Sequence, residues 1–386
     1  MSDLQELLHD AKVIVCVGSG GVGKTTTSAL LGMEAARRGR KVLVMTIDPA
    51  RRLASSLGIA DLDHAVQRVD LSAYGEASNA VHGELYATML DMKKAFDAIV
   101  ERYAADETSR QAIFDNRFYR FFSTSLAGAQ ELSASERLFE VVDSGDYDLV
   151  ILDTPPTTNA LDFLEAPHRY FDALDSSVLH FVMQAGSAMR GGRLGNLANQ
   201  LILRGLGRFT GTELFVELAD FFTHFSGLFE GFRERTRATA SLFSHDATRF
   251  VIISAPDPAT MGEALYFRSR LERYDVRLGA VVVNRIHPSL RDNPLTQASP
   301  QAIADALLTL PGAAIHGRPR LEQLAYALRQ SALEFQDLAD RDREVLSALE
   351  TSVASSAPVV AVPLLATDVH TLEGLDRLRQ HLFPST

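Results

Sequence analysis

The sequence predicts an α/β protein with a doubly wound, mainly parallel sheet flanked by helices, and with an additional helical subdomain. Six short apolar runs alternate with amphipathic patterns, as strands do when helices connect them in a parallel sheet. The first run passes directly into a glycine-rich loop and then into a helical pattern. Acidic residues follow two of the runs, at the end of a parallel strand where open α/β sheets bind ligands.

The elements follow from periodicity and from their boundaries. Each strand is a short, β-branched-rich apolar run bounded by glycine or polar residues, which is typical of a buried strand. The expected strands are residues 13–17, 41–47, 147–152, 249–255, 278–283 and 358–362. The expected helices are a leading helix at 1–11, then 24–37, 259–274, one or two long charged helices within 318–352, and a closing helix to residue 382.

Composition limits the class of protein. The chain has 386 residues, 46% of them hydrophobic and 23% charged, as in ordinary soluble globular proteins. No apolar run approaches the ~20 residues that span a bilayer, and the acidic start is no signal peptide, so we expect a cytoplasmic protein. The net charge of −11 disfavours nucleic-acid binding. The single cysteine, Cys16, excludes an intrachain disulfide and a cysteine-based zinc site.

The glycine-rich loop carries the most specific motif. Residues 18–25 match G-x-x-x-x-G-K-[ST], and they lie between a strand and a helix, where a phosphate-binding loop is found. Glycines let backbone N–H groups turn toward a phosphate, and the helix presents its positive end to it. We assign phosphate binding to Gly20, Gly21, Val22, Gly23, Lys24, Thr25 and Thr26. Lys24 is expected to reach the β- and γ-phosphates and Thr25 to bind Mg²⁺, so the predicted fold is a P-loop NTPase.

Two carboxylates at strand ends extend this site. Asp48 follows the second strand, where it either orients water near the γ-phosphate or caps the next helix, and both roles are compatible. Asp153 ends the third strand in the Walker-B arrangement and is expected to hold Mg²⁺. The segment Asp153, Thr154 and Pro155 begins a Thr/Pro-rich loop whose shape is expected to respond to the γ-phosphate. Further along the chain, Asn284 follows a strand, and its amide is suited to reading a base edge.

The chain divides into alternating core and helical parts. The expected units are the first part of the core at 1–83, with a loop and a short strand at 60–83, a helical region at 84–146, a core strand with its loop at 147–160, a helical insertion at 161–247, and the second part of the core at 248–386. The insertion is rich in Phe and Met, which suits a groove for an apolar helix. Ordinary helix packing or a dimer surface explains the same pattern, and the composition favours that interpretation.

Five motifs in order resemble a known family. They resemble the motifs of the arsenite-pump and tail-anchored-protein targeting ATPases, which are deviant-Walker-A ATPases, and most closely those of a bacterial branch with GSGG loops. The five motifs are VGSGGVGKTTTSALLG, TIDPARRLASSLG, LDTPPTTNALDFLEAP, VVNR and VPLLATDVHTLEGL. The resemblance implies a dimeric ATPase that uses ATP and Mg²⁺. It implies catalytic roles for Lys24 and for Asp48, which would orient the attacking water. It makes Asp153 the start of switch II, and places Asn284 and Pro363 beside adenine.

Departures from the family pattern shape the functional expectation. Ser19 stands where the family has a second loop lysine, so hydrolysis by the chain alone is expected to be low. The cysteines that bind zinc or arsenite in relatives are absent, so no zinc is expected. We expect an ATPase that couples Mg-ATP binding and hydrolysis to rearrangement of a homodimer, or of a heterodimer with a paralogous ATPase. The alternatives are a targeting factor or chaperone for apolar helices of membrane proteins, and a weakly hydrolysing nucleotide sensor.

Overall fold

The computed structural model describes residues 3–47, 52–59, 62, 65–71, 82–125, 129–155, 217–221, 223–224, 228–312, 315, 317–353, 357–369 and 371–383. Asp48, the continuation of switch II after Pro155, and most of the insertion expected at 161–247 lie outside these residues. Within the described part, no helix is long and apolar enough to cross a membrane.

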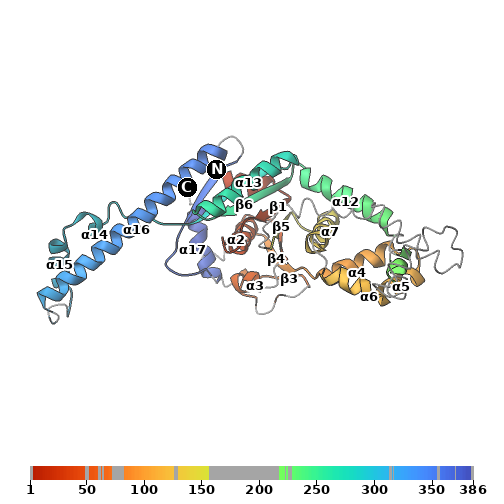
Figure 1. Ribbon diagram of the computed structural model, residues 1–386, viewed down its shortest axis with the longest axis horizontal. Helices are drawn as coiled ribbons and strands as arrows, with labels where there is room; N and C mark the ends of the chain where they lie inside the picture. The colour runs from red at the N-terminus through yellow and green to blue at the C-terminus, as the bar shows by residue number, and fades with distance from the viewer. Residues whose placement is uncertain are drawn as a thin grey trace, which may run out of the picture.

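The described residues form one eight-stranded sheet at the centre of the molecule (Figure 1). Its order is β3-β4-β2-β5-β1-β6-β7-β8, and all neighbouring strands are parallel except β3 and β4. The strands are β1 (Val13–Val17), β2 (Lys41–Thr46), β3 (Gln67–Arg68), β4 (Glu84–Met89), β5 (Leu149–Asp153), β6 (Thr248–Ser254), β7 (Leu278–Ile286) and β8 (Val359–Pro363). The doubly wound, mainly parallel sheet is therefore confirmed.

Helices cover both faces of the sheet, which explains why the central strands are apolar on both sides. One face packs against α1 (Asp3–Asp10), α2 (Lys24–Arg37), α3 (Arg52–Ser56) and α17 (Leu372–Leu382). The other packs against α7 (Ala129–Ser144), α12 (Phe229–Ser244), α13 (Pro258–Arg273) and the C-terminal end of α16 (Arg318–Val353). All five residues of β1 are buried between these two layers. The strand that leads into the phosphate loop is thus covered on both faces.

A helical subdomain has its own small core. It is built from α4 (Met92–Tyr103), α5 (Glu107–Asp115) and α6 (Arg117–Ser125), which bury Phe96, Ile113 and Tyr119 together, away from the sheet. The Tyr119 hydroxyl donates to Asp97 at 2.7 Å. The described residues from 92 to 125 are therefore mainly helical.

The expected helix was wrong at its start, because residues 84–89 form β4. Leu85 and Met89 lie four residues apart, which also fits a helix, but their segment pairs in parallel with β2. Leu85 and Ala87 are buried, and the burial alternates along most of the strand. The helix begins only after Asp91, whose carboxylate accepts a hydrogen bond from the Lys94 N–H and caps α4.

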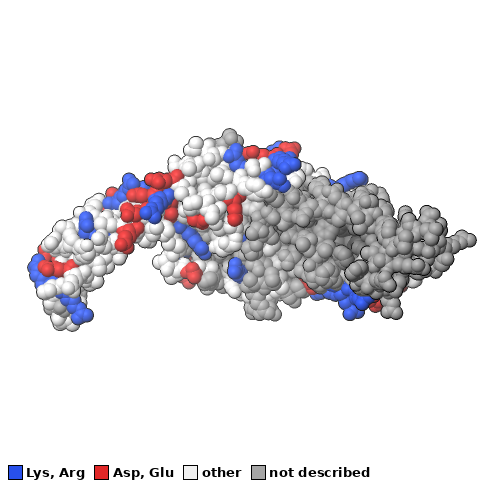
Figure 2. All heavy atoms as spheres, in the orientation of Figure 1, with Lys and Arg blue, Asp and Glu red and all other residues white. Residues whose placement is uncertain are grey.

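The C-terminal part forms an arm that projects from the body of the molecule (Figure 1). It consists of α14 (Pro294–Gln297), α15 (Pro300–Leu308) and the N-terminal part of α16, which is a single helix of 36 residues. The segment between β7 and α16 is therefore partly helical. On the visible face, basic and acidic side chains alternate along this arm (Figure 2), and ion pairs such as Arg318–Asp305 and Arg291–Asp340 connect its segments.

Candidate functional site

The loop between β1 and α2 needs glycine for conformation and for space. Gly18, Gly21 and Gly23 have φ angles of 152°, 77° and 101°, a region that side chains disfavour. A Cβ atom on Gly18 would lie 2.0 Å from the Ile253 carbonyl oxygen of β6. A Cβ atom on Gly23 would lie 2.3 Å from the Asn284 amide nitrogen. The loop is therefore clamped between neighbouring strands, while Gly20 and Gly21 stay exposed at its tip.

Lys24 supplies the positive charge of this loop. It is the first residue of α2, its side chain is 7% exposed, and its ammonium donates to the carbonyl oxygens of Gly18 at 2.8 Å and Ser19 at 2.7 Å. Gly23, at the N-cap of α2, provides no side-chain cap. The positive end of the helix and the ammonium thus face the same concave backbone, which is the arrangement that holds a phosphate.

Asp153, at the end of β5, is hydrogen-bonded to side chains of α2 and β2. Its carboxylate is fully buried at the end of β5 and accepts hydrogen bonds from the hydroxyls of Thr25 at 2.7 Å and Thr46 at 3.0 Å. The Ser28 hydroxyl lies 3.5 Å from its other oxygen. Strand register explains this meeting, since Asp153 is opposite Cys16 of β1 on one side and opposite Thr46 of β2 on the other.

The pair Thr25 and Asp153 fits a magnesium site chemically. Mg²⁺ prefers hard oxygen ligands and keeps several waters, so one hydroxyl and one carboxylate are a sufficient protein contribution. The Thr25 hydroxyl donates its hydrogen to Asp153 and retains lone pairs for a cation. Elsewhere in the described part of the chain, no group of three or more His, Cys, Asp or Glu residues is arranged to hold a metal ion.

The predicted start of switch II is buried. The Thr154 hydroxyl donates to the Cys16 carbonyl oxygen at 2.7 Å, and Thr154 is 3% exposed, whereas Pro155 is partly exposed. Cys16 lies beneath this contact, and burial raises the pKa of its thiol to about 12. Thr154 is therefore bonded to the same strand that leads into the phosphate loop.

Asn284 contacts the phosphate loop directly. Its amide nitrogen donates to the Val22 carbonyl oxygen at 2.9 Å, and its amide oxygen accepts from the Arg285 N–H at 2.9 Å. It lies within β7 and not after it, because that strand continues to Ile286. Pro363 is paired with Ile286 at the end of β8. Both atoms of the Asn284 amide that would read a base edge are thus engaged within the protein.

Ser19 has an acidic partner. Its hydroxyl donates to the carboxylate of Glu263 on α13, 244 residues away in the sequence. Sequence reasoning did not identify Glu263, Thr46 or Ser28 as part of this site. Only Thr46 carried a signal, because it ends a predicted strand next to Asp48.

The structure brings most of the predicted residues to one edge of the sheet. The carboxyl ends of three strands carry them: residues 18–26 follow β1 and begin α2, Asp153 and Thr154 lie at the end of β5, and Asn284 lies near the end of β7. Asp48 is not described, but the N–H of the preceding Ile47 donates to the Asp153 carbonyl oxygen at 3.3 Å. The chain therefore leaves β2 beside the proposed metal ligand.

Comparison with known proteins agrees with this geometry. The family model described as anion-transporting ATPase matches residues 11–302. The chain is 25% identical over 287 residues to the protein named ATPase get3 of Pyrenophora tritici-repentis, covering 73% of this chain and 76% of that protein. It is 26% identical to ATPase GET3 of Malassezia globosa over 289 residues, with the same two coverages. It is also 27% identical to the ATPase ASNA1 homolog of Leishmania infantum over 224 residues, covering 50% of this chain and 54% of that protein.

The family match covers the phosphate loop, both carboxylate-bearing strands and Asn284, and it ends before α16, β8 and α17. The candidate site thus lies within the matched residues, and α16 lies beyond them. The chain belongs to the anion-transporting ATPase family and is an ATPase.

Proposed function

We propose that the chain binds Mg-ATP at the carboxyl edge of β1 and β5 and hydrolyses it there. The observation that carries this proposal is the group formed beside the glycine loop by the buried Lys24 and Asp153 with the partly buried Thr25. The backbone of residues 20–26 and the Lys24 ammonium would hold the phosphates. Thr25 and Asp153 would hold Mg²⁺, which neutralises charge on the transferring phosphoryl group when it is bound.

The water that attacks the γ-phosphate would be oriented by Asp48. Phosphoryl transfer needs positioning and charge neutralisation more than covalent chemistry from the protein. Asp48 directly follows Ile47, whose backbone hydrogen bond to Asp153 anchors this part of the chain. We propose that Asp153, Thr154 and Pro155 transmit the state of the nucleotide to the rest of switch II.

Two variants test the site. Lys24→Ala is expected to abolish binding of a fluorescent ATP analogue, because the loop loses its only buried cation. Asp153→Asn is expected to retain measurable binding and to lower steady-state phosphate release at least about 100-fold, since the amide is a poorer metal ligand. Lys12→Ala is the matched control, because Lys12 is exposed at the opposite end of β1. Wild-type ATP affinity in the Lys24 variant would refute the proposed site.

We further propose that the base lies beside Asn284 and Pro363 and that it is adenine. Because the Asn284 amide holds the Val22 carbonyl, its primary role would be to support the phosphate loop, with the base packing against it. Asn284→Ala is then expected to weaken ATP and GTP by similar factors. A loss confined to ATP would show that the amide reads the adenine edge instead.

We propose that the active form is a dimer, either of two copies or with a paralogous ATPase. Ser19 supports this, because its hydroxyl is bonded to Glu263 and supplies no positive charge to the phosphoryl group. Light scattering with Mg-ATP or ADP, together with phosphate release, tests the idea. A dimer formed by this chain alone with Mg-ATP, but with little phosphate release, supports the proposal. Rapid turnover by a monomer would refute it.

A second candidate function is the targeting of apolar helices in the cytoplasm. It is motivated by the Phe- and Met-rich composition of residues 161–247, which suits an adaptable apolar surface. Co-purification with a co-expressed model transmembrane segment tests it, with Lys24→Ala as the control that cannot bind ATP. Capture that depends on ATP would support this function, and absence of capture in every nucleotide state would count against it.

A further inference from the structure

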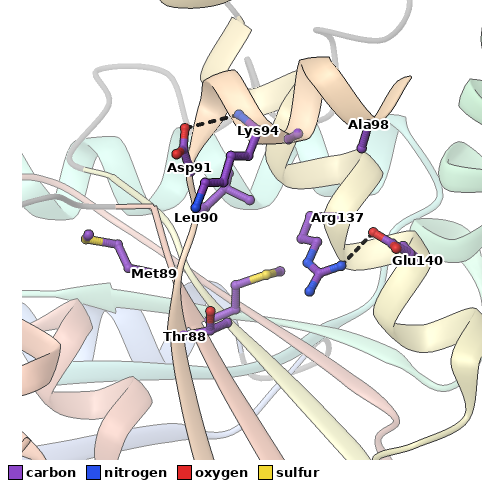
Figure 3. Close-up of a pocket in the computed structure, with 10 residues that line it drawn as sticks. Thr88, Met89, Leu90, Asp91, Lys94, Ala98, Arg137 and Glu140 are labelled. Carbon is purple, nitrogen blue, oxygen red and sulfur yellow. Dashed lines mark hydrogen bonds and ion pairs between the residues drawn. The ribbon is translucent and has the colours of Figure 1, made fainter. Parts of the chain in front are cut away.

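A cavity of about 220 Å³ lies where the sheet meets the helical subdomain. It is enclosed by the carboxyl ends of β2 and β4 and by one side each of α4 and α7 (Figure 3). Its lining residues are Met45, Thr88, Met89, Leu90, Asp91, Lys94, Ala95, Ala98, Arg137 and Glu140. Met45 and Thr88 are buried, whereas Lys94 and Glu140 are exposed. The cavity is thus apolar at its base and charged at its mouth.

Its size suits a ligand with a single ring. A dry cavity of about 150 Å³ accommodates benzene, and drug-sized ligands occupy roughly 300–1,000 Å³. The cavity lies between these values, so a ring with one short substituent fits it. The two methionines of its lining adapt to irregular shapes and make favourable contacts between sulfur and aromatic rings.

The charges at the mouth favour an anion. The Asp91 carboxylate is committed to capping α4, where it accepts from the Lys94 N–H at 3.1 Å. Glu140 pairs with one terminal nitrogen of Arg137 at 2.7 Å, and the guanidinium has further N–H donors. Among the described residues, the Lys94 ammonium has no hydrogen-bond or ion-pair partner. Figure 3 shows Lys94 and Arg137 extending from different helices, with the Arg137 guanidinium directed toward Glu140.

We propose that this cavity binds a small carboxylate with a single-ring apolar body. The carboxylate would pair with Lys94 and Arg137, and the ring would lie against Met45 and Met89. Burial of the ring supplies affinity, and the two cations supply selectivity for the charge. None of the phosphate-binding residues lines the cavity, so the site is separate from the ATP site and does not depend on the proposed function.

The position of the cavity gives the ligand a route to the nucleotide. Met45 precedes Thr46, whose hydroxyl donates to Asp153, and α4 belongs to the helical subdomain. A molecule seated here would contact both the strand beside Asp153 and the helices of the subdomain. Ligand binding and ATP binding are therefore expected to change each other's affinity by the same factor.

Ligand-observed NMR titration with phenylacetate tests the proposal on the full chain without nucleotide. Phenylacetamide is the neutral control of the same shape. Phenylacetate is expected to bind saturably and at least about tenfold more tightly than the amide. Lys94→Gln and Arg137→Gln are each expected to weaken it about fivefold or more. Lys93→Gln is the matched control, because Lys93 is the neighbouring lysine of α4 but is paired with Asp97.

A filling variant tests the location. Ala98→Leu adds a side chain at the exposed mouth, so the protein should fold normally, as circular dichroism would confirm, and phenylacetate binding should fall more than about tenfold. Equal affinities for acid and amide, unchanged binding in the Lys94 variant, or no saturable binding would each overturn the proposal. Lys24→Ala should retain phenylacetate binding, so failure of the ATP site and failure of this site are distinguishable.

Discussion

Gly23→Ala is expected to lower the stability of the protein through two separable effects. Gly23 has φ 101° and ψ 25°, a left-handed conformation that costs a residue with a side chain about 1–2 kcal/mol. The added Cβ would also lie 2.3 Å from the Asn284 amide nitrogen. That nitrogen must move, and its hydrogen bond to the Val22 carbonyl at 2.9 Å is then lost, at a cost of about 1 kcal/mol. The total loss of unfolding free energy is therefore about 2–3 kcal/mol.

A double-mutant cycle isolates the second effect. Asn284→Ala alone removes the same hydrogen bond and is expected to cost about 1 kcal/mol. In that background Gly23→Ala no longer meets the amide, so only the backbone strain of about 1–2 kcal/mol remains. The double variant should then be about 1 kcal/mol more stable than the sum of the single losses, a coupling larger than the scatter expected of independent sites.

Urea unfolding followed by circular dichroism measures the unfolding free energies of wild type, the two single variants and the double variant. Binding of a fluorescent ATP analogue reports whether the phosphate loop keeps its binding conformation. Gly145→Ala is a useful control, because Gly145 also has a positive φ, of 69°, but its Cβ would meet nothing within 4 Å. It should show strain without coupling to Asn284. Additive losses at Gly23 and Asn284 would refute the reasoning, since they would mean that the amide does not clamp the loop.

Three further predictions concern groups around the site. Because burial raises the pKa of the Cys16 thiol to about 12, native protein at pH 8 should react with iodoacetamide far more slowly than urea-unfolded protein, as mass spectrometry would show. The raised pKa also means that the contribution of Cys16 to the free energy of unfolding should decline as the pH rises above the ordinary thiol value of 9.0. Asp342→Ala should lower the free energy of urea unfolding by about 2 kcal/mol, because the buried Asp342 carboxylate accepts from the backbone N–H of His287 at 2.8 Å and contacts the His287 ring at 2.7 Å. Asp340 is more exposed, so Asp340→Ala should cost under about 0.5 kcal/mol. Equal losses in the two variants would contradict this reasoning. Partial burial favours a higher pKa for Asp257, but hydrogen bonding to the first turn of α13 holds that pKa below its ordinary value. Asp257→Ala should therefore cost about 1 kcal/mol of unfolding free energy near neutral pH, and the difference from wild type should shrink as the pH falls through the native pKa. A difference that stays constant with pH would exclude the charge as its source.

The sequence allowed the central fold and the phosphate loop to be predicted, because their signals are local. The β1 run is buried on both faces, so its apolar pattern is continuous, and the loop glycines are needed by the backbone itself. The prediction failed at residues 84–89, where Leu85 and Met89 have a spacing that fits helix and strand alike. Pairing with β2, which is more than 35 residues earlier, decided the outcome, and no local window contains that information.

The sequence by itself therefore determined the main groups of the candidate site, which are Lys24, Thr25 and Asp153, each at the end of a recognisable strand or at the start of a helix. Only the tertiary structure decided what surrounds these groups. Thr46 reaches Asp153 because β2 lies beside β5, and Glu263 reaches Ser19 across 244 residues. Asn284 holds the Val22 carbonyl, and α4 and α7 close a cavity over β2 and β4. Strand order and helix placement bring these residues together through long-range burial of apolar surface, which depends on the whole chain at once.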